Sequence, residues 1–141
     1  MNVVIAADKS GQKLKQLIRI FLEAKENDYK IVDLSDSDIY TSTMNVVNAI
    51  TNKTADRGII VDAYAVAPFM IANKNHGIIC ASIYEDYTAQ MTRTHNNTQI
   101  ICLGAKITAD NLSCKLAYNF LKSEYAGGRH QIRVDMLNRM L

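Results

Sequence analysis

The sequence has little of what marks several common classes of protein. Only one glycine stands in residues 6–11, after the first apolar run, and no Walker loop is present, so a dinucleotide or nucleotide site is poorly supported. The three cysteines form no CxxC pair, which argues against a zinc site or a disulfide framework and favours buried, reduced thiols. No repeat, low-complexity tract or Pro/Gly/Ser linker interrupts the chain, so we expect one domain over residues 1–141.

Excess charge of one sign is missing too. The 16 basic and 14 acidic residues are scattered and give a net charge of +2, so no basic stripe indicates a nucleic-acid partner. The first residues, MNVVIAAD, have no basic lead and turn polar after a few apolar residues, which is unlike a signal peptide or a membrane span. We therefore expect a cytoplasmic protein that binds neither nucleic acid nor membrane.

Short apolar runs alternate with helical periodicity along the whole chain. The runs predicted as strands are residues 3–7, 29–34, 59–61, 77–81 and 99–103. The runs are apolar on both faces and helical segments separate them, which is typical of a parallel sheet covered on both sides. The prediction is an α/β fold: a three-layer, doubly wound (Rossmann-like) domain with a five-stranded parallel sheet.

The intervening segments predict helices. Apolar residues at a spacing of three and four lie in residues 14–22, 46–50 and 108–123, and Pro68 suits the first turn of a helix that reaches Asn73. Ser82 and Glu85 have the S-x-x-E form of a capping box, which predicts a helix opening there.

A last helix is predicted from about residue 130 to the end. Val134, Leu137 and Leu141 lie on one side of it. The preceding units already cover both faces of the sheet, so we expect this extra C-terminal helix to pack on a partner subunit.

Two arginines are candidates for binding an anion. Arg129 and Arg133 stand four residues apart in the predicted helix, so both guanidinium groups can project from one face toward one phosphate. They follow Gly127 and Gly128, which allow the backbone to approach a ligand. The alternative is a solvated basic surface, which is common for paired arginines.

One histidine is a candidate for acid–base work. His95 stands between a predicted helix and the last strand and is followed by Asn96 and Asn97. A neutral imidazole can transfer protons near pH 7, and the amides can donate to sugar oxygens. The alternative is a loop histidine followed by turn-forming asparagines. We expect His76 and His130 to form local hydrogen bonds or to lie on the surface.

Two aspartates end apolar runs. Asp8 and Asp62 should lie near the same edge of the sheet, and either could act as a base. The alternative is that each accepts hydrogen bonds from backbone N–H groups of its own loop, as aspartate usually does at such turns.

Three motifs together give the chain a family resemblance over essentially its whole length. They are RTHNN at residues 93–97, CLG at 102–104 and YAGGRHQIR at 125–133. With them the chain resembles the family of type B ribose-5-phosphate isomerases and galactose-6-phosphate isomerase subunits. The resemblance implies that His95 opens the sugar ring, that Asn96 helps hold the enediolate oxygens, and that Arg129 and Arg133 bind phosphate.

One segment departs from that family. In catalytically complete relatives the third strand ends in Cys-Gly-Thr-Gly, whose cysteine moves the C2 proton, whereas residues 62–65 here read DAYA. The thiol is absent and Tyr64 would crowd a sugar. Similarly, an Asp-His pair often follows the first strand in the family, but here Asp8 is followed by Lys9. Asp8, Asp62 and Tyr64 are therefore candidate substrate-loop residues without an assigned role.

The resemblance implies an aldose–ketose isomerase without metal or other cofactor. Its substrate would be a phosphorylated hexose, with galactose 6-phosphate and tagatose 6-phosphate interconverted through a cis-enediol in lactose and galactose breakdown. A B-type isomerase subunit would supply the catalytic cysteine. Two alternatives stay open: a self-sufficient pentose- or hexose-phosphate isomerase with Asp62 as base, and a non-catalytic structural subunit.

Overall fold

A parallel sheet forms the middle layer of the structure, a computed structural model that describes residues 1–25 and 29–140. Within that part of the chain the sheet has five strands in the order β2-β1-β3-β5-β4, and every neighbouring pair is parallel. The strands are β1 (Asn2–Ala7), β2 (Lys30–Asp33), β3 (Arg57–Asp62), β4 (Cys80–Ser82) and β5 (Ile100–Gly104). Each predicted strand is present, and the predicted doubly wound α/β fold is confirmed.

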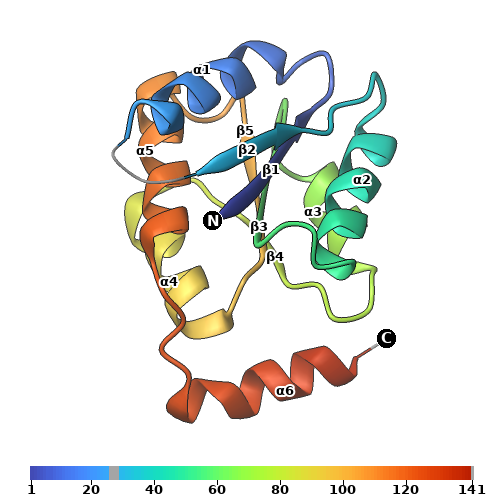
Figure 1. Cartoon of the computed structure of the whole chain (residues 1–141), viewed down its shortest axis with the longest axis vertical. Coiled ribbons are helices and arrows are strands. Elements are labelled where there is room, and N and C mark those ends of the chain that lie inside the picture. The colour runs from blue at the N-terminus through green and yellow to red at the C-terminus, as the bar shows by residue number, and fades with distance from the viewer. Residues whose placement is uncertain (26–28, 141) are drawn as a thin grey trace.

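Helices cover both faces of the sheet (Figure 1). One face carries α1 (Gln12–Glu23), α4 (Asp86–Asn96) and α5 (Asp110–Lys122), and the other carries α2 (Ile39–Thr51) and α3 (Ala67–Asn73). Pro68 lies in the first turn of α3, as predicted. A short 3-10 turn, η1 (Gly128–His130), leads into the last helix, α6 (Gln131–Arg139).

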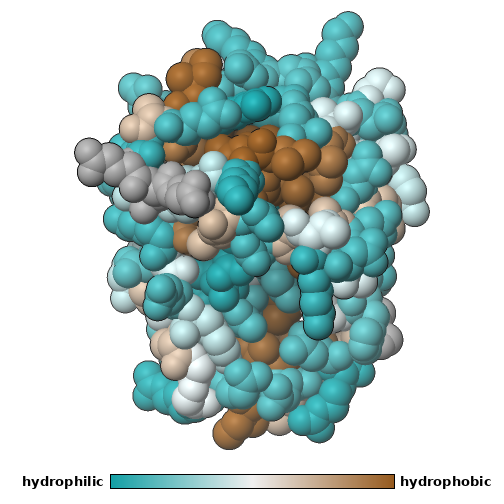
Figure 2. All heavy atoms as spheres, viewed as in Figure 1, coloured by the Kyte–Doolittle hydropathy of each residue, from teal (hydrophilic) through white to brown (hydrophobic). Residues whose placement is uncertain are grey.

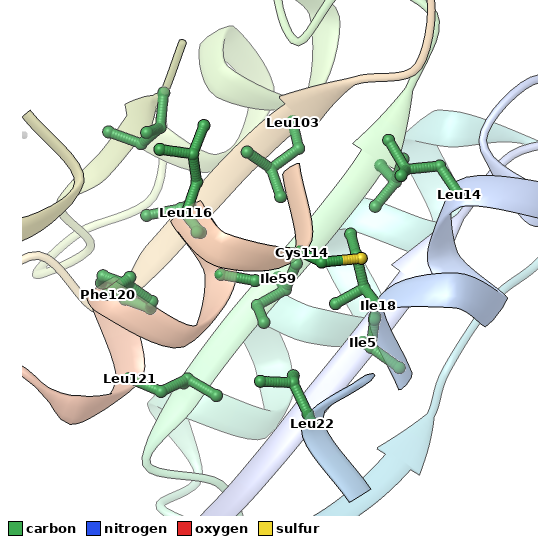
Figure 3. Close-up of a cluster of buried hydrophobic side chains, with 14 of the residues drawn as sticks. Ile5, Leu14, Ile18, Leu22, Ile59, Leu103, Cys114, Leu116, Phe120 and Leu121 are labelled. Carbon is green, nitrogen blue, oxygen red and sulfur yellow. The ribbon is translucent and has the colours of Figure 1, made fainter. Parts of the chain in front are cut away.

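The core explains why these segments form these elements. Figure 3 shows side chains of α1 and α5 meeting those of β1, β3 and β5, among them Leu14, Ile59 and Phe120. Each of these three side chains is at most 2% exposed, and burying one such side chain contributes about 1.5–3 kcal/mol. Gly11 precedes α1 where the helix passes over β3, and an added Cβ would lie 2.2 Å from the Val61 carbonyl oxygen. The core thus fixes how closely the loop after β1 approaches the end of β3.

The start of α4 differs from the predicted capping box. Ser82 is the last residue of β4, and its hydroxyl donates to the Ala65 carbonyl oxygen (2.5 Å) rather than capping a helix. Glu85 is itself the cap, because its carboxylate accepts from the backbone N–H groups of Tyr87 (2.6 Å) and Thr88 (2.7 Å). A carboxylate has two acceptor oxygens and can do this alone. The motif was correct about the helix and wrong by three residues about its start.

The last helix lies across one end of the molecule, beside the C-terminal end of α4 (Figure 1). Val134 is buried, but Ile132 (65%), Met136 (59%) and Met140 (63%) are largely exposed. Packing of this helix on a partner subunit remains a prediction, and Leu141 lies outside the described residues. Apolar side chains also gather over the edge strand β2, where Val32 is 54% exposed (Figure 2). In residues 1–25 and 29–140 no helix is long and apolar enough to cross a bilayer.

An ion pair between a buried lysine and a more exposed aspartate links α1 to the end of β2. The ammonium of Lys15, a residue only 5% exposed, donates to the Asp33 carboxylate (2.5 Å) and to the Ser35 hydroxyl (2.8 Å). Partial burial pushes the pKa of Asp33 up, but the hydrogen bonds from Lys15 and Ser35 outweigh it and hold the pKa below its usual value. The pair therefore stabilises the fold while Asp33 is ionised.

Acid should remove this contribution. Because the folded-state pKa of Asp33 is lowered, its contribution is present above the unfolded value of about 3.9 and is lost as the pH falls through the folded value. We expect Asp33→Asn to be less stable than the parent at pH 7, since it leaves the Lys15 charge buried and unpaired, and this difference should shrink in acid. Urea unfolding from pH 7 to acid measures both effects. Asp36→Asn, an exposed position in the next loop, is the control; an equal pH dependence in both variants would contradict the prediction.

Candidate active site

The candidate residues fall into two groups at opposite edges of the sheet. Asp8 follows β1 and Asp62 ends β3, so both lie at the carboxyl edge, where β1 and β3 are neighbours and the order of strands along the chain reverses. His95 and Asn96 are the last two residues of α4. This helix runs from the end of β4 back toward the start of β5, so both residues lie at the amino edge, where the strands begin (Figure 1). The length of β5, roughly 13 Å for five residues, separates the two edges.

The amino-edge cluster consists of His95, Asn96, Arg129, His130 and Arg133. The imidazole rings of His95 and His130 stack with their centroids 4.1 Å apart and their planes 14° apart. The backbone N–H of Ala126 donates to the carbonyl oxygen of Thr94 (3.0 Å), which fastens the segment before η1 to the last turn of α4. The structure thus brings together the candidate acid–base residue and the segment that carries both candidate phosphate-binding arginines.

His130 is more than the surface residue expected from the sequence. Partial burial lowers its pKa, and the charges of His95, Arg129 and Arg133 lower it further, so the ring stays neutral at pH 7. A neutral ring can stack on His95 without repelling a positive charge there. The contact joins two segments far apart in the chain, so neither helical periodicity nor motif spacing could have indicated it.

Both arginines of the cluster are available to a ligand. Arg129 and Arg133 are exposed, and neither side chain forms a hydrogen bond or an ion pair with any residue that the structure describes. Gly127 (φ +62°) and Gly128 (φ +57°) take left-handed backbone conformations that turn the chain into η1 just before Arg129. Free guanidinium groups beside a histidine suit the recognition of a phosphate dianion.

Asn96 also lines a pocket beside the edge strand β4. The pocket has a volume of about 470 Å³, and Phe69, Ser82, Tyr84 and Leu137 are among its other lining residues. Its lining comes from α3, β4, α4 and α6, and it is apolar apart from a few hydroxyl and amide groups. A small polar ligand held by the amino-edge cluster would therefore lie next to a largely apolar wall.

Asp62, at the carboxyl edge, is held by its own loop. It is 7% exposed, and its carboxylate accepts from the backbone N–H of Ala65 (2.6 Å), the arrangement expected of an aspartate that organises a turn. Burial raises its pKa; the hydrogen bond from Ala65 offsets part of this, and the negative charge of Asp8 raises the pKa further. A raised pKa suits a general base, but the Ala65 bond occupies one oxygen.

The other two carboxyl-edge candidates have contacts of their own. One carboxylate oxygen of Asp8 accepts from the backbone N–H groups of Ser10 (2.9 Å) and Gly11 (3.2 Å), so this side chain organises the loop after β1. Tyr64 is 53% exposed, and the ammonium of Lys106 lies 5.9 Å from its ring centroid. Nothing in this geometry replaces the missing thiol.

The cysteines are not available as replacements. Cys80, Cys102 and Cys114 are free and buried, as predicted, and burial raises the pKa of Cys102 and Cys114. The Sγ atoms of Cys80 and Cys102 lie 3.4 Å apart on adjacent strands. In the part of the chain that the structure describes, no three His, Cys, Asp or Glu side chains are placed to hold a metal ion.

Sequence comparison gives this geometry a family context. The sequence profile of the Ribose/Galactose Isomerase family matches residues 3–137. Galactose-6-phosphate isomerase subunit LacA 2 of Streptococcus pyogenes serotype M1 is 42% identical over 143 aligned residues, covering 99% of both chains. Subunit LacA of Streptococcus mutans serotype c has the same identity and coverage.

Solved structures agree with the sequence relatives. Ribose-5-phosphate isomerase B from Mycoplasma genitalium, solved with bound ribulose 5-phosphate, is 32% identical with a TM-score of 0.88, over 98% of this chain and 94% of that one. Ribose-5-phosphate isomerase B of Clostridium thermocellum is 30% identical with a TM-score of 0.92, over 98% and 95%. This chain therefore shares its fold with these two isomerases over 98% of its length.

Proposed function

Because this chain belongs to the ribose/galactose isomerase family, we propose that it is the A-type subunit of a cytoplasmic galactose-6-phosphate isomerase. It interconverts D-galactose 6-phosphate and D-tagatose 6-phosphate together with a B-type subunit, and it serves the breakdown of lactose and galactose. The full-length likeness to subunits of that name supports the substrate. The amino-edge cluster supports the chemistry.

The proposed reaction uses the chain's own residues in three roles. His95 transfers protons at the ring and anomeric oxygens, which opens the cyclic sugar to its aldehyde. Asn96 then donates to the enediolate that forms when the C2 proton is removed, and the proton returned to C1 completes the ketose. Arg129 and Arg133 hold the phosphate, which fixes the sugar relative to His95.

The separation of the two edges carries this proposal. All residues proposed to act on the sugar lie at the amino edge, while the loop that ends in cysteine in complete relatives lies at the carboxyl edge and reads DAYA. Two aspartates at that edge would also repel a phosphate dianion. A chain with half of the required groups needs a base from elsewhere, and we propose that the cysteine of a B-type subunit provides it.

Exposed apolar side chains near the pocket support a subunit partner. Val66 (49%), Phe69 (37%), Tyr84 (42%) and Leu137 (38%) all line the pocket. Removing such side chains from water is the main driving force of subunit association. A partner that covers this surface would also reach Asn96, so assembly and completion of the site would coincide.

A second candidate has one observation in its favour. The raised pKa of Asp62 is what a carboxylate base near a carbonyl requires, so a self-sufficient isomerase would use this residue. Its distance from His95 and its bond to Ala65 count against it. A purely structural subunit is disfavoured because the stacked histidines and two unpaired arginines remain together at one edge.

Binding of phosphorylated sugar tests the proposal at Arg133. We expect Arg133→Ala, in the assembly with the B-type subunit, to weaken tagatose 6-phosphate binding by about tenfold to more than a hundredfold, since a charge-assisted bond to a dianion contributes about 1.5–3 kcal/mol. Titration calorimetry measures the dissociation constant. Arg139→Ala on the same helix is the matched control, and unphosphorylated galactose should bind both variants alike. An unchanged constant for Arg133→Ala would place the phosphate elsewhere.

A further inference from the structure

Arg93 is a conspicuous buried residue beside the amino-edge cluster to which no role has yet been given. It is 5% exposed, and it forms no ion pair within residues 1–25 and 29–140. Its Nε is buried without a hydrogen-bond partner in the same part of the chain. Burial, and then the positive charge of Arg57, lower its pKa to about 10, so it remains charged at pH 7. A buried, unpaired guanidinium is costly, and such a group needs a structural or functional reason.

The one bond that Arg93 makes points to that reason. Its Nη1 donates to the carbonyl oxygen of Thr98 (2.8 Å), across the turn that carries His95 and Asn96 from α4 into β5. Asn97 in this turn has a left-handed backbone (φ +55°). Arg93, in the last turn of α4, is therefore bonded across the chain reversal that follows the two candidate catalytic residues.

Two further contacts close the same turn. The hydroxyls of Thr92 and Thr98 are 2.7 Å apart, and the backbone N–H of Thr98 donates to the Thr92 carbonyl oxygen (3.3 Å). Both threonines are buried. All three contacts converge on Thr98, so Thr98 is the fixed point from which the chain runs back to Asn96 and His95.

We propose, on the basis of the proposed function, that Arg93 is a positioning residue. It holds the His95–Asn96 turn in the geometry that ring opening and enediolate binding require. The side chain touches the turn from inside and does not touch the substrate. Catalytic groups must be held within a fraction of an ångström, and buried hydrogen bonds from the layer behind them do this. Burying a charged guanidinium costs free energy, but its planar N–H groups can reach the Thr98 carbonyl oxygen from α4, and this bond is the reason for an arginine at this position.

Arg57 provides a matched control. It too is a partly buried arginine, it lies near enough to Arg93 to lower its pKa, and its Nε is also without a partner in the described chain. Its Nη1, however, donates to the carbonyl oxygen of its neighbour Asp56 (2.7 Å), and among the described residues its side chain forms no hydrogen bond with the turn. Substituting Arg57 removes a similar charge and similar packing but leaves the bond to Thr98 in place.

The test compares Arg93→Met, Arg93→Lys and Arg57→Met in the assembly with the B-type subunit. We expect Arg93→Met to lower kcat by about tenfold to a hundredfold, the effect of a small misplacement of catalytic groups, with KM unchanged because Arg129 and Arg133 still hold the phosphate. Arg93→Lys should recover part of this loss, because an ammonium can also donate to Thr98. Arg57→Met should leave kcat near that of the unsubstituted assembly.

Amide hydrogen exchange on the chain alone gives a readout that is independent of activity. Arg93→Met should speed exchange in residues 96–98 and Arg57→Met should not. Equal losses of kcat in the two methionine variants, or unchanged exchange in residues 96–98, would overturn the positioning role. If Arg93→Met does not fold, Arg93→Lys against Arg57→Lys decides, and equal kcat values overturn the proposal. An unsubstituted assembly without isomerase activity would instead defeat the proposed function, and the exchange measurement would still test Arg93.

Discussion

The purified chain alone should show little or no conversion of galactose 6-phosphate, and it should gain full activity when it is mixed with a B-type subunit. The reason is spatial: His95, Asn96 and the two arginines proposed to bind phosphate lie at one edge of the sheet, and no thiol is available there in the described chain, since the cysteines are buried. Without a base that removes the C2 proton, the open-chain sugar cannot form the enediolate and no ketose is produced. Assays of each subunit alone and of the mixture, with tagatose 6-phosphate as the measured product, make the comparison.

Full turnover by the isolated chain would contradict this prediction. In that event Asp62→Asn separates the remaining possibilities, because the amide oxygen of asparagine can still accept from the Ala65 N–H while it cannot take a proton from carbon. Loss of activity in that variant would establish Asp62 as the base of a self-sufficient isomerase. In the mixed assembly, by contrast, we expect Asp62→Asn to retain activity.

The architecture could be predicted from the sequence because its signals are local. The apolar runs of β1, β3 and β5 are continuous and buried on both faces, and the helices between them keep a regular apolar spacing. The strand order could not be predicted in the same way. That β5 lies between β3 and β4 depends on which faces the connecting helices cover, and this is decided by packing far along the chain.

The candidate site was predictable only where its residues are consecutive. The run RTHNN and the run from Tyr125 to Arg133 could be recognised as motifs, but neither contains the information that His95 and His130 stack. Arg93 lies inside a recognised motif, but it was given no role, because the sequence alone does not distinguish a buried arginine from an exposed one. Its role emerges only from the bond to Thr98 and from its 5% exposure.

Ser82 and Asp62 show a related difficulty. Asp62 was placed correctly at a strand end, and Ser82 was predicted to cap a helix although it is the last residue of β4. The partner of a short polar side chain depends on which loop passes nearby. Ser82 donates to Ala65 and Asp62 accepts from it, so both stabilise the same turn. The loop with the altered DAYA sequence is thus well anchored, although it lacks the groups of a complete isomerase.

Replacing His95 by alanine should remove most of the assembly's turnover on the cyclic sugar phosphate. General acid–base help contributes about a hundredfold to ten-thousandfold to the rate, and His130 is a poorer proton donor than an ordinary histidine, since partial burial and then the neighbouring positive charges lower its pKa. Assembly itself should persist, because the His95 side chain is only partly buried and the core does not depend on it. Initial rates on galactose 6-phosphate and the mass of the complex by light scattering measure the two properties separately.

His76→Ala is the matched control for this substitution. His76 lies in the exposed turn between α3 and β4, away from the last turn of α4, so its removal should leave the rate unchanged. His130→Ala should have an intermediate effect, because it removes the ring that stacks on His95 at 4.1 Å but leaves the acid–base group in place. If His95→Ala turned over substrate at the normal rate, or simply failed to assemble, then ring opening would belong to another residue. The stacked pair would then be a structural contact between α4 and η1.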